Sequence, residues 1–258
     1  MSVITLLTDF GSQDGYVAAM VGYLHTHAAN TKVYEVSHDI TPQDVWQAAF
    51  ALKRYAKEFP AETIHISVID PGVGSDRKAL ALKCDRQWLI GPDNGVLSLA
   101  AELYENVEAF QIRSNTPWWN KHSSFDGLAL FTPAALKLAT APDNIHEYLS
   151  PLPHFHQLSF PKPDVVGQQM MGQIVTFDRF GNAITNITKA DIPSDHPVII
   201  YSGHHRFETT THYCNAPANG QCAIINSDGL LELAVYQGSA RSELGLEVGH
   251  NISFSISE

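Results

Sequence analysis

The stretch Thr63-Ile64-His65-Ile66-Ser67-Val68-Ile69-Asp70-Pro71-Gly72 decides the fold class. Its first seven residues form a short, mostly apolar and β-branched run, which predicts a buried strand that ends in the Asp-Pro-Gly turn. The same pattern occurs near the N-terminus, where the run Val3 to Leu7 is followed by Thr8-Asp9-Phe10-Gly11. Ligands of open α/β sheets bind at the carboxyl ends of the strands, so both carboxylates stand where a site is expected.

Segments with helical spacing separate the predicted strands. The elements expected in the first part are, in order, a strand over 3–7, a helix over 15–27, a strand over 33–36, a helix over 42–59 with Thr41 as its N-cap, and the strand over 63–69. Strands and helices that alternate at these lengths predict an α/β domain with a largely parallel sheet, which we place at residues 1–150.

The second part of the sequence has a different character. Prolines at 151, 153, 161 and 163 predict a linker over residues 151–166. Short β-rich runs separated by turn signals follow it, at 172–177, 183–187, 197–201, 222–226, 230–236 and 251–256. They predict a small all-β domain, a barrel or sandwich, over residues 167–258.

Composition excludes several classes of partner. The chain has 258 residues, with 16 Lys+Arg against 27 Asp+Glu, a formal net charge of −11. Binding of nucleic acid needs clustered basic residues, and none is visible. The apolar start is broken by Asp9 well short of a signal sequence or membrane span, which predicts no membrane partner. The 3 cysteines lack C-x-x-C spacing and are typical of reduced thiols, so a cytoplasmic protein is expected.

The 13 histidines raise the question of a metal site. The close pairs at 25/27, 154/156 and 204/205 have no cysteine or acidic residue at the spacing of known ligand sets. The sequence therefore predicts neither a metal nor a cofactor.

Carboxylates are the stronger candidates for a site. Asp9 and Asp70 end strands in glycine turns, where a backbone can approach a ligand closely and an ionised carboxylate can accept two hydroxyls. Arg77 follows Asp70 by seven residues and can return to pair with it, which would hold the carboxylate ionised. Asp14 precedes the first helix, where an N-cap role is the simpler interpretation.

Other polar loops allow both a structural and a ligand-binding interpretation. Asn94-Gly95 suits a turn with positive φ as well as a ligand contact. Asp126-Gly127 precedes a helical run, whose backbone N–H groups are suited to an anion or a nucleophile. In the second half, the loops at 178–182 and 226–229 each fit a turn better than a site when taken alone.

Taken together, these segments resemble one family. It is the S-adenosyl-L-methionine (SAM) hydroxide adenosyltransferase family, which is similar to the bacterial fluorinase and chlorinase. The stretches that carry the resemblance run in family order along nearly the whole chain, at 7–11, 14–17, 39–45, 68–77, 91–95, 177–187 and 226–234.

The resemblance implies a fold, an assembly and residue roles. It implies an N-terminal α/β domain and a C-terminal β-barrel in a homotrimer, with the site at a subunit interface. The implied catalytic residues are Asp70, Arg77 and Asp126, at the positions of a water-activating set. The implied substrate-binding residues are Asp9 at the ribose hydroxyls, Asp14, Asp178 and Ser227 around the methionine moiety, Phe180, Asn182, Glu232 and Val235 near adenine, and Asn94 and Gly127.

The implied activity is hydrolysis of SAM to adenosine and L-methionine. The sulfonium departs as neutral methionine, so the site needs a rigidly bound substrate and an activated water in line with C5′. A halide needs no deprotonation, and the carboxylate of Asp70 would repel it, so water is favoured over chloride or fluoride.

One stretch departs from the hydrolase pattern, at three of its five positions. The pattern reads Phe-His-Gly-Arg-Asp where this chain has Phe125-Asp126-Gly127-Leu128-Ala129. Two carboxylates near one water would repel each other, which leaves a weakened SAM- or adenosine-binding protein as an alternative to the hydrolase. A SAM-dependent halogenase, as in the related fluorinase and chlorinase, is the other alternative. His122, four residues upstream, is a candidate replacement for the missing histidine.

Overall fold

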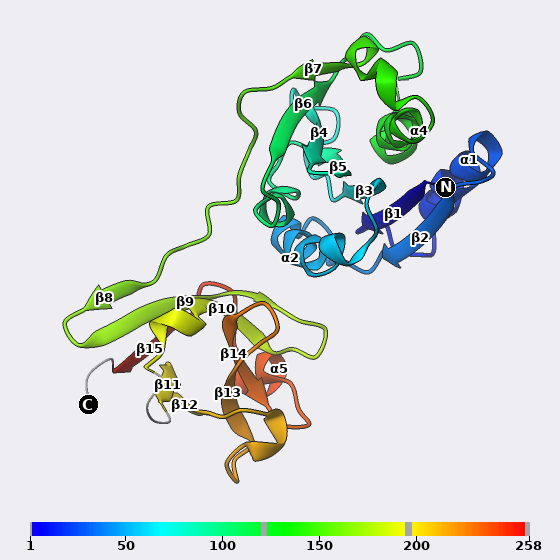
Figure 1. The fold of residues 1–258 in the computed structure, drawn as a ribbon. Coiled ribbons are helices and arrows are strands. Elements are labelled where there is room, and N and C mark those ends of the chain that lie inside the picture. Colours follow the sequence, from blue (N-terminus) through cyan, green and yellow to red (C-terminus); the bar gives the residue numbers. More distant parts are fainter. Residues whose placement is uncertain (1, 120–122, 194–197, 256–258) are drawn as a thin grey trace. The chain divides into compact units, whose positions relative to one another are not determined.

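A mixed seven-stranded sheet forms the centre of the N-terminal half (Figure 1). The computed structural model describes residues 2–119, 123–193 and 198–255, and the chain divides into two compact units, residues 1–158 and 159–258. That division falls inside the range where the sequence predicts a linker, whose own boundaries stay a prediction. His122 lies outside the described residues.

The strand order of this sheet explains where its site can form. In space the strands follow β2 (Lys32–Ser37), β1 (Val3–Thr8), β3 (Thr63–Val68), β5 (Gln87–Pro92), β4 (Ala79–Cys84), β6 (Val107–Ile112) and β7 (Leu149–Pro151). The first four are parallel to one another, and the remaining pairings are antiparallel. The predicted α/β class is confirmed, with a sheet that is mixed and only partly parallel.

Helices cover both faces of this sheet. Alternate strand residues belong to two separate apolar clusters, because successive side chains of a strand point to opposite faces. One cluster takes up α1 (Tyr16–His27), the π-helical turn Gly127–Phe131 and α4 (Thr132–Thr140). The other takes up α2 (Val45–Tyr55) and α3 (Ser98–Ala101).

The starts of the first two helices differ from the prediction. Asp44, and not Thr41, is the N-cap of α2, and its carboxylate accepts a hydrogen bond from the Gln47 N–H at 2.8 Å. The helix begins late because residues 41–44 form a turn in which Gln43 has a φ of 69°. Gly15 precedes α1 in a left-handed conformation without a side-chain cap, so the N-cap interpretation of Asp14 is wrong.

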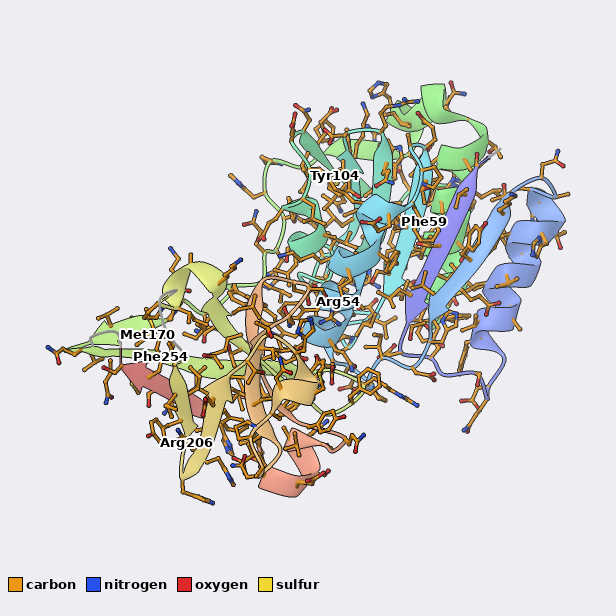
Figure 2. All side chains as sticks on the ribbon, turned by 60° about the horizontal axis from the view of Figure 1, so that its bottom comes forward. Arg54, Phe59, Tyr104, Met170, Arg206 and Phe254 are labelled. Carbon is orange, nitrogen blue, oxygen red and sulfur yellow. The ribbon has the colours of Figure 1, made fainter. Side chains whose placement is uncertain are left out.

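The second unit is a closed barrel, as predicted. Its strands follow the order β10 (Ala183–Thr188), β14 (Leu230–Val235), β13 (Gln221–Ile225), β12 (His205–Thr209), β11 (Ile199–Ser202), β15 (Asn251–Ser255) and β9 (Gln169–Phe177). Pairing of β9 with β10 closes these seven strands, and β8 (Asp164–Val166) adds to β9 outside the ring. Neighbouring strands contribute paired core side chains such as Met170 and Phe254 (Figure 2). The short helix α5 (Ala240–Leu244) follows β14.

Short 3-10 turns complete the connections. They cover Ala56–Glu58, Pro142–Glu147, Lys189–Asp191 and Tyr213–Asn215. None of the helices in the described part of the chain combines the length and the apolar character that a membrane crossing requires.

Candidate functional site

The carboxyl end of β1 presents Asp9 to a cavity. Gly11 beyond it donates its N–H to the His38 carbonyl at 2.8 Å, and Thr8 and His38 are linked through Oγ1 and Nδ1 at 2.8 Å. Burial lowers the pKa of His38, although Glu35 opposes the shift. Asp9 Oδ2 accepts the Gln43 N–H at 2.8 Å, and no described residue bonds to Oδ1. The carboxylate is therefore held on one side and can accept from a ligand on the other.

Gln43 holds Asp9 from an uncommon backbone conformation. Its φ of 69° lies in the left-handed region, which costs a residue with a side chain roughly 1–2 kcal/mol. Such strain persists where the surroundings determine it and often marks a functional position. Here the conformation directs a backbone N–H at a carboxylate in the cavity wall.

Asp70, Arg77 and Asp126 form one ion-pair cluster. Arg77 donates through Nε to Asp70 Oδ1 at 3.1 Å and through Nη2 to Asp70 Oδ2, and Nη2 also donates to Asp126 Oδ2 at 2.5 Å. The three side chains are only 11%, 6% and 10% exposed for Arg77, Asp70 and Asp126, respectively. The guanidinium lies over the Phe131 ring, 5.5 Å from its centre.

The cluster carries one more negative than positive charge. Burial disfavours the charge on Arg77, but the hydrogen bonds and charges of Asp70 and Asp126 outweigh it, and the pKa of Arg77 is raised. The repulsion expected between the two carboxylates is therefore offset by a guanidinium that both of them bind.

A cavity of about 320 Å³ brings the predicted acidic residues together. Four predicted residues line it, namely Asp9, Asp70, Asp126 and Gly127, and Arg77 supports two of them from behind. The sequence did not point to the other lining residues, which are Phe10, Pro42, Gln43, Val68, Pro71, Val73, Ser124 and Phe125. Most of them flank the predicted residues in sequence, and that adjacency was the signal available.

Gly127 has a steric reason to be glycine. A Cβ at this position would lie 2.6 Å from Phe125 Cε2, 3.1 Å from Phe10 Cε2 and 3.2 Å from Met20 Sδ. Phe10 and Phe125 meet edge to face with ring centres 5.4 Å apart. Gly127 thus lets the helix start pack against the aromatic wall of the cavity.

Besides Arg77, two predicted residues of the first unit do not line this cavity. Asp14 is exposed just before α1, and no described residue donates to its carboxylate. Asn94 donates from Nδ2 to the Ile69 carbonyl at 2.8 Å, and its Oδ1 accepts the Val96 N–H at 3.2 Å. The Asn94 amide is therefore engaged by the backbone on both sides.

The barrel holds a second cavity, of about 730 Å³. Four predicted residues line it, Asp178, Phe180, Asn182 and Val235. The sequence did not point to Tyr213, Tyr236, Gln237, Gly238 and Ser239, which complete the lining.

Asp178 fixes part of the lining of the barrel cavity through hydrogen bonds to its neighbours in the chain. Its Oδ1 accepts the N–H groups of Phe180 at 2.9 Å and Asn182 at 2.8 Å, and its Oδ2 accepts Asn182 Nδ2 at 2.9 Å. Asn182 is buried while the Phe180 ring is 75% exposed, which leaves an aromatic face available at the rim.

Glu232 and Ser227 are not among the residues that line the barrel cavity. Glu232 is 3% exposed and accepts from Tyr213 OH at 2.6 Å and from Asn226 Nδ2 at 3.2 Å. Burial and the Glu232 carboxylate raise the pKa of Tyr213, so that hydroxyl stays a donor. Ser227 is exposed at the tip of the loop that Asn226 closes through bonds to the Asp228 and Leu230 N–H groups.

Within the described residues, no three His, Cys, Asp or Glu side chains are arranged to hold a metal ion.

Comparisons with known proteins match both halves of the chain. The family model described as the SAM hydroxide adenosyltransferase N-terminal domain matches residues 4–147, and the C-terminal domain model matches residues 172–253. This chain belongs to the SAM hydroxide adenosyltransferase family.

Similar individual proteins agree with this assignment. A protein of Thermus thermophilus named (R)-S-adenosyl-L-methionine hydrolase is 33% identical over 96% of this chain and 98% of its own length. The crystal structure of an uncharacterized conserved protein from Thermotoga maritima matches with a TM-score of 0.83 and 28% identity, over 98% of this chain and 99% of that one. The predicted relation to fluorinase is confirmed by a fluorinase of an Actinoplanes species, 26% identical over 74% of this chain and 73% of its own length.

Proposed function

We propose that this protein hydrolyses SAM to adenosine and L-methionine. The observation that carries the proposal is the buried Asp70–Arg77–Asp126 cluster in the cavity wall of a SAM hydroxide adenosyltransferase family member. The substrate is the (R) sulfonium epimer, the form named for the Thermus thermophilus relative.

The residues of the cavity supply what the reaction needs. A water molecule beside Asp70 attacks C5′, a carbon–oxygen bond forms, and the C5′–S bond breaks with its electron pair going to sulfur. The water's proton passes to the carboxylate and then to solvent, and methionine leaves as a neutral thioether that needs no general acid. Arg77 holds both carboxylates in place, so the site needs little reorganisation during the reaction.

Charge complementarity favours a cationic substrate. Asp9, Asp70 and Asp126 line one cavity, and Arg77 binds the last two of them. An excess of carboxylates attracts a sulfonium and an ammonium group. The same excess repels chloride or fluoride, which argues against the halogenase alternative.

Each binding residue is assigned to one part of the substrate. Asp9 Oδ1 accepts the ribose hydroxyls, and Asn182 and Val235 in the barrel cavity contact adenine beside the Phe180 ring. Asp14, Asp178 and Ser227 act around the methionine moiety, and Glu232 acts through Tyr213. The protein is a cytoplasmic homotrimer with the site at a subunit interface, and light scattering of the purified protein tests its assembly.

The decisive experiment is a product assay with one matched pair of variants. Purified protein is incubated with the (R) and (S) epimers of SAM, with and without chloride, and adenosine is followed by chromatography. Asp70→Asn should abolish turnover while adenosine still binds. Asp76→Asn, the same change at an exposed position of the same loop, should leave turnover unchanged.

Three results would contradict the proposal. Tight binding of SAM without adenosine above the blank would favour the binding protein. 5′-Chloro-5′-deoxyadenosine in high chloride would favour the halogenase. Full turnover of the Asp70→Asn variant would remove that carboxylate from the mechanism.

A further inference from the structure

The loop that carries Asp70 and Arg77 joins β3 to β4 and crosses the end of β5, the strand that lies between them in the sheet. It leaves β3 after Val68 and enters β4 at Ala79, and β5 separates these two strands in the sheet. β5 is parallel to β3 and antiparallel to β4, with Ala79 opposite Pro92. The chain that continues β5 therefore emerges directly at the base of the loop.

The two residues that follow β5, Asp93 and Asn94, form hydrogen bonds with both ends of the loop. Asn94 Nδ2 donates to the carbonyl of Ile69, the residue before Asp70, at 2.8 Å. The Asp93 N–H donates to the carbonyl of Lys78, the residue after Arg77, at 2.9 Å. Two consecutive residues thus fix the entrance and the exit of the segment that bears the ion pair.

The turn itself is fixed so that it can act as a support. A Cβ on Gly91 would lie 2.3 Å from the Ser67 carbonyl oxygen, so only glycine permits this approach to β3. Asp93 Oδ1 accepts the His156 N–H at 2.7 Å from the far side. Asn94 Oδ1 accepts the Val96 N–H at 3.2 Å, which orients the amide so that Nδ2 faces Ile69.

We propose that Asn94 is a positioning residue, which sets the place of the Asp70 carboxylate by holding the Ile69 carbonyl, and that it does not contact the substrate. The inference rests on the hydrolase function proposed above. Asp70 has little freedom of its own, since its side chain is 6% exposed and bonded to Arg77. Displacement of its backbone would therefore move the cluster as a unit, and misplacement of a catalytic group by about 1 Å can lower a rate on the order of 100-fold.

Kinetics separates positioning from substrate contact. Asn94→Ala should lower kcat by about 10- to 100-fold while the Kd for adenosine stays within about twofold. Asn94→Asp keeps an acceptor for the Val96 N–H but lacks the donor to Ile69, so it should show the same loss of kcat. Asn106→Ala serves as the matched control, because Asn106 Nδ2 bonds to Asp85 Oδ1 in the turn between β4 and β5, at the other end of these strands. It should leave kcat unchanged.

Hydrogen exchange gives a readout that does not depend on activity. Amides of residues 69–78 should exchange faster in both Asn94 variants than in the wild type or in Asn106→Ala. Unchanged exchange in 69–78, or a rise in the adenosine Kd of about tenfold with kcat retained, would overturn the positioning role. If the wild type forms no adenosine while exchange in 69–78 rises as expected, the hydrolase proposal fails and the structural role of Asn94 stands.

Discussion

Acidification should destabilise the first unit through a single buried histidine. His65 lies in the middle of β3 and is fully buried, with Nδ1 and Thr5 Oγ1 2.8 Å apart. The rings of Tyr55 and Phe59 lie against it, with centres 5.6 and 5.7 Å away, and Figure 2 marks Phe59 in this part of the unit. Burial lowers the pKa of His65 from 6.5 to about 4, although the side chain of Gln87 opposes the shift.

The sign and the size of the effect follow from that pKa. Above the unfolded pKa of 6.5, both states are neutral and the folded state keeps its full stability. Between 6.5 and about 4, the unfolded chain binds a proton at His65 that the folded chain does not, so stability falls with decreasing pH. The loss contributed by this residue is about 2 kcal/mol at pH ~5 and about 3 kcal/mol at pH ~4, and it levels off below that.

The assay uses the distribution of tryptophans. All 4 tryptophans, at 46, 88, 118 and 119, belong to the first unit, so their emission reports its unfolding and not that of the barrel. Urea unfolding is measured between pH 7.5 and 4 for the wild type and for His65→Asn. Asparagine can keep a bond to Thr5 but does not titrate, so the variant carries every other pH effect of the unit.

The difference between the two proteins isolates the histidine. His65→Asn should be less stable at neutral pH because the smaller side chain leaves a cavity, and the gap should close by about 3 kcal/mol on the way to pH ~4. A gap that stays constant with pH would refute the reasoning, because it would mean that His65 binds protons equally in both states.

Three further predictions concern the two cavities. Gln43→Gly should raise stability by about 0.5 kcal/mol and preserve adenosine binding in calorimetry. Gln43→Pro removes the N–H that Asp9 accepts and also excludes the φ of 69°, so it should weaken binding at least about tenfold; equal effects of the two variants would contradict the backbone role. Gly181→Ala should destabilise the barrel by about 3 kcal/mol in circular dichroism melts, because φ is 83° and the new Cβ would lie 2.1 Å from Ser239 Oγ; a shift below about 1 kcal/mol would show that the turn relaxes. Asp126→Asn keeps the shape but removes one of the two charges that hold the guanidinium, so adenosine formation should fall about tenfold; an unchanged rate would exclude a catalytic role for this charge.

Local signals predicted much of the fold. The apolar runs of β1 and β3 identified strands, because a strand buried on both faces needs apolar residues at nearly every position. β4, β6, β7, β8 and β12 were not among the predicted strands. β4 and β5 form a hairpin through a tight turn at Asp85, where φ is 49°. The alternation of strands and helices predicts a parallel sheet, and consecutive parallel strands are not joined by a hairpin.

The site residues that directly follow a strand could be predicted from the sequence. Asp9 and Asp70 follow strands, so sheet geometry alone places them at one edge. Gln43 was missed because its contribution is a backbone N–H in a turn that resembles the first turn of a helix. Glu232 was named from resemblance, and only the fold shows that it acts on Tyr213 from a buried position.

The unpredicted strand β4 is what turns an acidic strand end into an ion-pair cluster. In a purely parallel arrangement, the chain after Asp70 would leave the sheet edge in a crossover helix, and Arg77 would travel away with it. Because β4 instead runs back beside β5, the chain must return to the edge within the few residues before Ala79, and Arg77 is carried back over Asp70. In the described sheet, the loop between β3 and β4 crosses one strand end, that of β5. Asp93 and Asn94 follow that end and hydrogen-bond to the loop there. The antiparallel half of the sheet therefore has a chemical consequence: it brings a cation to a carboxylate that the parallel half would leave without one.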